Sequence, residues 1–398
     1  MANRHNPKLR FGMTLREAED SSFQPSLANA PPLPAVNYGL VGKPAPSLLP
    51  TQSGSLPKAS AVVITWAGPE WAALQHVFCA GGSTMPYSER SRGIWTGWEK
   101  YSANLPSGRP SDWSYWGYYR TVEINGEVVL LFKSNTHLDW PGATFLTALI
   151  KLIIADVKPG LILSIGTAGG AKPQDHIGTV RAVSAGTLYE SKKPASSWPE
   201  YKNGWTANGA TLANANFKQL LFPVPTKASD LETLCSQFNQ QYHKAYTLSD
   251  LDPGGLNLGD PTPQIGNQTG GGASLLTAST FLVGTTAGTY QNYTAIEMDD
   301  AVIAEACAGR GAAFGFVRNL SDPAQSAALP PKVQGEWGGA VYDQYGFYTS
   351  YSGAGGRLGD AGLKMRILGR AASDQVAGQC FATASRTGVS TSGGAFSM

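Results

Sequence analysis

The stretch TFLTALIKLIIADVKPGLILSIGTAGG, residues 144–170, determines the fold class of this 398-residue chain. Apolar residues recur at helical spacing over 144–158, and Pro159-Gly160 ends the expected helix. The uninterrupted apolar run over 161–165 predicts a buried strand, and the glycine-rich segment 166–170 predicts a loop directly after it. This order is typical of an open α/β sheet, in which ligands bind at the carboxyl ends of the strands.

The flanking segments extend the same pattern. Ala61–Trp66 predicts a second buried strand, and Gly68-Pro69 opens a helix after it. Asn125-Gly126, between two alternating apolar runs, predicts a β-hairpin. Further strands are expected over 178–183 and 313–320, and a further helix over about 298–309. The sequence therefore predicts a three-layer α/β/α sandwich around a mixed central sheet.

Composition excludes several classes of protein. The net charge of +2 lacks the basic excess of a general nucleic-acid or anionic-membrane binder. The most apolar stretch, 145–157, is too short to span a bilayer and contains Lys151. The first residues have no apolar signal-peptide core, so we expect a cytoplasmic protein. The four cysteines are scattered without metal-ligand spacing, so neither a disulfide scaffold nor a structural zinc site is expected. Nothing else in the sequence implies a metal or an organic cofactor, and none is expected.

Composition also divides the chain. Residues 1–58 form a Pro-rich arm, with eight prolines between 21 and 60, and we expect either a mobile tail or an arm laid on a neighbour. Residues 59–352 are expected to form the main domain, with an insertion at about 189–273 that contains one helix, 229–242. Residues 353–398 are a tail rich in Gly, Ala and Ser.

Three segments place polar groups at the ends of apolar elements. They are 66–70, 164–170 and the run from 295–299 to 317–322. Each has a local explanation, since acidic residues favour helix N-termini and Asp322 precedes a proline. The glycine segment matches neither nucleotide-binding fingerprint, so it does not by itself imply a phosphate site.

Together and in this order, the three segments resemble the nucleoside phosphorylase/nucleosidase superfamily, and especially its 5′-methylthioadenosine/S-adenosylhomocysteine nucleosidase branch. The resemblance covers most of residues 60–325, and its most specific part is 296–322, a Glu-Met-acid triplet, a helix and a strand that ends in Arg…Ser-Asp. It implies a phosphorylase/hydrolase-like fold and hydrolysis of the N-glycosidic bond of a purine nucleoside or related nucleotide.

The resemblance also implies a role for each matching residue. Asp322 would be the general acid that protonates the departing purine, and Arg318 would orient the water or a neighbouring carboxylate. Glu70 would position the attacking water as a general base, and Asp299 would bind the ribose hydroxyls. The other residues expected to contact the substrate are Met298 on the sugar, Phe281 on the base, and Glu297, Thr167, Ala168 and Gly169.

Two departures from the family pattern leave alternatives open. Family members usually have Glu where Asp299 stands, which allows an altered sugar preference or a nucleoside-binding regulatory protein. Phosphorolytic members have Arg where Ser164 stands, so water is favoured over phosphate as the nucleophile. A phosphorylase remains the nearest alternative, with Arg90, Arg92 or Arg181 as the candidates to supply the missing cation. A further alternative is a nucleotide-depleting effector whose arm or insertion docks a partner.

Two features are assigned to structure and not to chemistry. His137 follows a predicted strand, within reach of the sugar or its 5′ substituent, and a structural histidine is the favoured interpretation. The aromatic-rich stretch 95–119 is expected to form core or a subunit contact. A homo-oligomer is therefore expected, because proteins of the resembling family commonly assemble.

Overall fold

The computed structural model describes twelve stretches of the chain. These are residues 31–38, 45–80, 82–89, 96–183, 185–190, 192–202, 228–251, 265–268, 274–279, 282, 284–342 and 344–351. The predicted C-terminal tail, residues 353–398, and most of the predicted insertion lie outside them.

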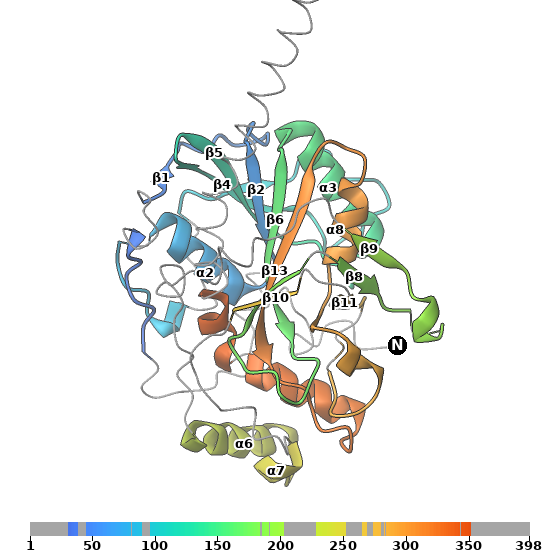
Figure 1. Ribbon diagram of the computed structural model, residues 1–398. Helices are drawn as coiled ribbons and strands as arrows, with labels where there is room; N and C mark the ends of the chain where they lie inside the picture. Colours follow the sequence, from blue (N-terminus) through green and yellow to red (C-terminus); the bar gives the residue numbers. More distant parts are fainter. Residues whose placement is uncertain are drawn as a thin grey trace, which may run out of the picture.

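A mixed sheet of thirteen strands forms the centre of the molecule (Figure 1). Its middle strand, β6 (Leu161–Gly169), pairs in parallel with β2 (Ala61–Thr65) on one side and with β13 (Ala313–Asp322) on the other. Beyond β2 come β5 (Glu127–Ser134), parallel to it, and β4 (Gly117–Ile124), antiparallel to β5. The apolar runs that predict β2 and β6 are fully buried, as expected for strands covered on both faces.

The sheet divides at the carboxyl end of β6. One branch continues through short strands that begin with β12, and the other runs from β13 to β7 and β10. The bounds of these strands are β12 Ala295–Glu297, β11 Leu275–Thr277, β8 Ala185–Leu188, β9 Glu200–Lys202, β7 Val180–Val183 and β10 Ile265–Gln268. At the opposite edge, β1 (Ser47–Leu48) and β3 (Glu99–Tyr101) both pair with β4.

Helices cover both faces of the sheet, which confirms the predicted α/β/α layers (Figure 1). Helix α2 (Gly68–Cys79) shares one core with Val63, Leu163 and Val317. Helices α3 (Ala143–Val157) and α8 (Asp300–Cys307) share the other core with Val62 and Phe314 on the opposite face. None of the helices within the described residues is long and apolar enough to cross a membrane.

Local signals placed α3 and the hairpin correctly. In α3 the residues at helical spacing, from Leu146 to Val157, are buried, and Lys158 ends the helix with φ of 55° while its N–H donates to Ile154 O at 3.1 Å. In the hairpin, Asn125 and Gly126 have φ of 55° and 83°. Positive φ at both central residues is the geometry that the Asn-Gly pair favours.

The prediction of a glycine loop at 166–170 is wrong. Strand β6 continues to Gly169, because β13 pairs with it from Ala313↔Leu161 to Asp322↔Gly169 and satisfies its backbone groups. Glycine is required here by close approach: a Cβ on Gly166 would lie 2.0 Å from Nη1 of Arg318, and one on Gly169 would lie 2.9 Å from Oδ2 of Asp322. The glycines therefore make room for side chains and do not make a turn.

One helix boundary differs from the prediction, and one helical region was not predicted. Helix α8 begins at Asp300, so Met298 and Asp299 lie in the link that follows β12. Residues 331–342 and 344–351 are helical, which was not predicted, although Val333, Trp337, Val341 and Tyr345 recur at helical spacing and are buried. Helix α6 (Ala228–Tyr242) of the insertion, which was predicted, packs through Phe238 on Trp337.

The described part of the Pro-rich arm lies on its own chain. Leu33 is fully buried and exchanges backbone hydrogen bonds with Met85 at 2.8 and 3.0 Å. Pro34 O lies 2.8 Å from Nε2 of His76 in α2, and Tyr348 donates to Pro31 O at 2.8 Å. The remaining short helical segments are α7 (Leu248–Leu251) and the 3₁₀ turns Tyr87–Glu89, Ala195–Ser197 and Thr289–Asn292.

Candidate active site

A cavity lies at the carboxyl ends of β2 and β6, where the sheet divides, and it has a volume of about 410 Å³ including its part open to solvent. Its walls include most of the residues that the sequence places in a site: Glu70, Thr167, Ala168, Gly169, Glu297, Met298, Asp299 and Arg318. The other lining residues are Trp66, His137, Leu282 and Ile296. Residues from six separate segments thus meet at the position where α/β sheets bind ligands.

Glu70 is held on both carboxylate oxygens. It lies in the first turn of α2, so its Oε2 accepts from Trp66 N at 3.0 Å and Ala67 N at 2.8 Å at the start of the helix. The hydroxyl of Thr65 donates to the same oxygen at 3.0 Å. Its Oε1 accepts from Thr167 N at 2.7 Å and from Thr167 Oγ1 at 2.8 Å. These contacts fix the carboxylate at the junction of β2 and β6.

Arg318 lies in a cage of carboxylates. Its Nε donates to Asp300 Oδ2 at 2.9 Å and its Nη2 to Asp300 Oδ1 at 2.6 Å, a bidentate pair. The same Nη2 lies 2.9 Å from Glu297 Oε2, and Ser164 Oγ donates to Asp300 Oδ1 at 2.7 Å. The guanidinium also lies 5.3 Å from the centre of the Trp66 ring. Burial opposes its charge, but Asp300 and Glu297 outweigh burial and raise the pKa of Arg318.

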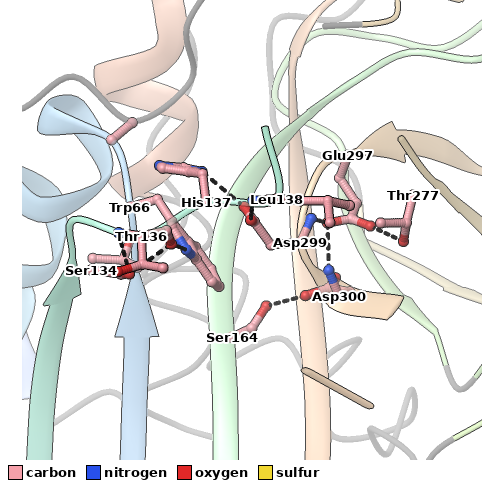
Figure 2. Close-up of polar contacts among 12 residues, drawn as sticks. Trp66, Ser134, Thr136, His137, Leu138, Ser164, Thr277, Glu297, Asp299 and Asp300 are labelled. Carbon is pink, nitrogen blue, oxygen red and sulfur yellow. Dashed lines mark hydrogen bonds and ion pairs between the residues drawn. The ribbon is translucent and has the colours of Figure 1, made fainter. Parts of the chain in front are cut away.

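Glu297 accepts hydrogen bonds from backbone N–H groups at the start of α8 (Figure 2). Its Oε2 accepts from Asp299 N at 2.7 Å and Asp300 N at 3.0 Å, and its Oε1 accepts from the hydroxyl of Thr277. Burial, and then the nearby Asp300 carboxylate, raise the pKa of Glu297, whereas Arg318 opposes this rise. Glu297 thus supports the site at the same time as it lines it.

Asp299 is paired with His137 (Figure 2). Its Oδ2 lies 3.1 Å from Nδ1 of His137, and its Oδ1 accepts from Leu138 N at 3.0 Å. Burial opposes the charged imidazole, but the Asp299 carboxylate, with a smaller effect of Asp139, raises the pKa of His137. Both oxygens of the predicted ribose-binding carboxylate are therefore already engaged by this chain.

Asp322 contrasts with these groups, because it has few partners. Its side chain is buried, and Ser321 Oγ donates to its Oδ1 at 2.9 Å. Its Oδ2 is buried without a hydrogen-bond partner and faces Gly169, a residue of the cavity wall. Burial raises the pKa of Asp322 to about 7, and the bond from Ser321 only partly offsets it.

The sheet register gives the spacing of these groups. Arg318 lies opposite Gly166, and Asp322 lies opposite Gly169, three residues further along β6. At about 3.3 Å per residue, the two positions are separated by roughly 10 Å along the strand. The cavity thus has Arg318 and Glu70 at one end and Gly169 at the other, with Asp322 behind Gly169 and outside the lining.

Sequence reasoning missed or misjudged several site residues. In the sequence Asp300 fits the general preference of acidic residues for helix N-termini, yet in the structure it accepts hydrogen bonds from Arg318 and Ser164. His137 had been assigned to structure, yet it lines the cavity. Trp66 is predicted only as the last residue of a strand, yet it forms part of the cavity wall. Proximity of these residues depends on tertiary folding, and their only sequence signal was a place just after a strand.

Other predicted residues lie outside the site or outside the described residues. Phe281, proposed to stack on the base, lies outside the described residues, as do Arg90 and Arg92. Arg181 pairs with Asp175 at 2.9 Å and is not part of the cavity wall. Within the part of the chain that the structure describes, no group of three or more His, Cys, Asp or Glu side chains is arranged to hold a metal ion.

Comparison with known proteins gives matches among solved structures only. No family model matches the chain, and no curated protein does. The chain is similar to structures of nucleosidases. At 11–14% identity and a TM-score of 0.39–0.40, this likeness gives no information on chemistry, which has to come from the cavity's own residues.

Three of these structures illustrate the range. The 5′-methylthioadenosine/S-adenosylhomocysteine nucleosidase of Campylobacter jejuni has 11% identity and a TM-score of 0.39, over 76% of this chain and 99% of its own. The futalosine hydrolase of Helicobacter pylori has the same identity and TM-score, over 76% and 96%. The S-adenosylhomocysteine nucleosidase of Streptococcus pyogenes has 14% identity and a TM-score of 0.40, over 78% and 98%.

Proposed function

We propose that this protein hydrolyses the N-glycosidic bond of a purine nucleoside or related nucleotide and releases the free base and the sugar. The observation that carries the proposal is Asp322, a buried carboxyl with one unpartnered oxygen behind Gly169 in the cavity wall. A carboxyl in this setting holds its proton near neutral pH and can donate it to a bound molecule.

The acid acts on the leaving group. Protonation of a purine ring nitrogen by Asp322 removes the negative charge that would otherwise develop on the departing base. The wall beside Gly169 is completed by Ala168, Leu282 and Ile296, whose apolar side chains suit a flat aromatic base. The base is therefore placed at the Asp322 end of the cavity.

The opposite end suits the cationic sugar that forms as the bond breaks. Glu70 and Arg318 approach the same face of Gly166: a Cβ there would lie 3.4 Å from Glu70 Oε1 and 2.0 Å from Arg318 Nη1. A carboxylate so placed stabilises positive charge on the sugar and can hold one hydrogen of a water molecule. Five hydrogen bonds fix Glu70 in place to orient the water, and it accepts the proton that the water loses as the C–O bond forms. Asp322 gives its own proton to the base as the C–N bond breaks, and proton exchange with solvent then restores both carboxyl groups.

Water is favoured over phosphate as the nucleophile. A phosphate ion needs charge-assisted contacts, and Arg318 is the only arginine or lysine among the described residues that line the cavity. Its guanidinium is already paired with Asp300 and Glu297. Ser164 stands where the phosphorolytic members of the resembling family have a phosphate-binding arginine, and its hydroxyl donates to Asp300. A phosphate ion that entered the cavity would therefore meet carboxylates, which repel it, and an arginine whose charge is already neutralised.

The test is to incubate the protein with purine nucleosides and nucleotides, with and without phosphate, and to measure free base and sugar by chromatography. Phosphate-independent release of base is expected. Release only with phosphate, together with a sugar 1-phosphate product, would show a phosphorylase instead. Binding without turnover in either buffer would show a nucleoside-binding protein.

A further inference from the structure

His137 has one ring nitrogen that no group of the protein uses. Its Nδ1 lies 3.1 Å from Asp299 Oδ2, whereas its Nε2 is buried without a hydrogen-bond partner. The residue is 5% exposed, and it lines the cavity. Buried ring nitrogens in folded proteins are nearly always satisfied, so an unpartnered one at a cavity wall indicates a group supplied by a ligand.

The position of His137 identifies which part of a ligand it meets. Its ring lies 6.1 Å from that of Trp66, which in turn covers the guanidinium of Arg318. His137 is therefore at the Arg318 end of the cavity, the end that lies roughly 10 Å along β6 from Asp322. With the base at Asp322, the sugar is the part of a nucleoside that reaches His137.

The charges around His137 favour a neutral partner. The acidic groups near His137 are Asp299, Glu70 and Asp139, and they outnumber the nearby cations, because Arg318 is already paired and Lys133 is the other one. An anionic substituent would be repelled by these carboxylates. A hydroxyl can both donate and accept, so it satisfies Nε2 whether or not that nitrogen carries a proton. A sugar hydroxyl therefore suits this site better than a phosphate or carboxylate does.

We propose that His137, oriented by Asp299, is the residue that selects the sugar, through a hydrogen bond between its Nε2 and a sugar hydroxyl. This inference rests on the proposed nucleoside substrate. It also explains the shorter acid at position 299: Asp299 does not itself extend to the sugar but holds an imidazole that does. In this arrangement His137 contacts the substrate and Asp299 is a positioning residue.

The test removes each partner of the proposed hydrogen bond in turn. Adenosine and inosine are compared with their 2′-deoxy, 3′-deoxy and 5′-deoxy counterparts, and both kcat/KM for base release and Kd by calorimetry are measured. The wild-type protein is expected to disfavour one deoxy series by roughly 10- to 100-fold, because that analogue leaves buried Nε2 unpaired. The series that is disfavoured identifies the hydroxyl.

Variants assign the discrimination to His137. In His137→Phe, which keeps a ring of similar shape, and in His137→Ala, the ribonucleoside and the selected deoxy analogue should differ by less than about threefold. His243→Ala, at an exposed histidine after α6, is the control and should retain wild-type discrimination. Circular dichroism confirms that each variant is folded, and either folded His137 variant suffices.

Each outcome has a defined meaning. Wild-type discrimination that persists in the folded His137 variants would overturn the role of His137 and leave the nucleosidase intact. Equal treatment of all deoxy analogues by the wild-type protein would overturn it too. Binding of the nucleosides without base release would reject the hydrolase but still test His137 through Kd. Failure to bind any nucleoside would overturn both proposals.

Discussion

Asp300 and Asp322 are aspartates of almost identical burial, 0% and 1% exposed, and both lie behind the wall of one cavity, Asp300 behind Arg318 and Asp322 behind Gly169. Asp300 accepts from two nitrogens of Arg318 and from Ser164, and it begins helix α8. Asp322 accepts one hydrogen bond, from Ser321, and leaves its other oxygen unpartnered. Burial is shared by the two residues, so the number of donors is what separates them.

The difference indicates how one fold can place two kinds of carboxyl group beside the same cavity. Asp300 is held by an arginine, whereas Asp322 can exchange a proton. A buried carboxylate with a bidentate arginine forms part of the framework, because removal of either partner leaves a buried charge uncompensated. A buried carboxyl with one neutral donor keeps its proton to higher pH and can exchange it with a ligand. The comparison therefore predicts opposite consequences of substitution at the two aspartates.

Asp322→Asn should have the largest effect on activity. The amide keeps the shape of the side chain but has no proton to donate to the base, so kcat for base release should fall by roughly 10²- to 10⁴-fold. Stability should not fall. The measurement is steady-state release of purine, with Asp112→Asn as a control at an exposed aspartate. Near wild-type activity in Asp322→Asn would show that another group is the acid.

Asp300→Ala should have the largest effect on stability. Loss of the bidentate partner leaves the buried Arg318 guanidinium with Glu297 alone, and about 3–5 kcal/mol of unfolding free energy should be lost. Urea denaturation gives this difference. Asp112→Ala, again the exposed control, should stay within about 0.5 kcal/mol of the wild-type protein. A similarly small loss in Asp300→Ala would remove the distinction between a framework aspartate and a titrating one.

Those features of the fold that depend on local chemistry were predictable from the sequence. Asn125-Gly126 fixes the hairpin because both residues adopt positive φ, and the apolar spacing in 144–158 fixes α3 within one residue. The helical residues 331–342 and 344–351 carry the same kind of signal at Trp337 and Tyr345, but they are not among the predicted elements. The segment 166–169 misled, because glycines that admit Arg318 and Asp322 have the same composition as a loop.

The sequence predicted many of the residues that line the cavity, but not the contacts that these residues make with one another. Resemblance of motifs brought Glu70, Arg318 and Asp322 together, and the structure places Glu70 and Arg318 in the cavity wall with Asp322 behind it. The pair His137–Asp299 joins residues 162 positions apart in the sequence, and no local pattern carries such a contact. Which oxygens are engaged and which are free is likewise set by the packed fold alone.

The pH dependence of stability should sharpen the contrast. Between about pH 4 and 7 the unfolded chain has released the Asp322 proton, whereas the folded chain still holds it. Folding is therefore accompanied by proton uptake, and the stability of the wild-type protein should fall as pH rises through this window. Asp322→Asn lacks this contribution, so its stability relative to wild type should increase by up to about 4 kcal/mol from pH 4 to 7.

Urea denaturation of both proteins at several pH values from 4 to 8 gives this difference directly. Other titrating groups, including Glu297, are present in both proteins and largely cancel in the comparison. Parallel curves for the two proteins would mean that Asp322 has no raised pKa in the folded chain.

Ser321→Ala should produce the smallest effect and the most specific one. The Ser321 hydroxyl donates to Asp322 Oδ1 at 2.9 Å and lowers the pKa of that carboxyl, in opposition to burial. Because base release requires protonated Asp322, kcat/KM in the wild-type protein should decline above about pH 7. Without the hydroxyl, this decline should move to higher pH by up to about one unit, the equivalent of one buried hydrogen bond. The measurement is kcat/KM between pH 5 and 9. An unchanged decline would contradict the assignment even if Asp322→Asn were inactive, because a group that only supports the structure would not transmit the loss of its hydrogen bond to the pH profile.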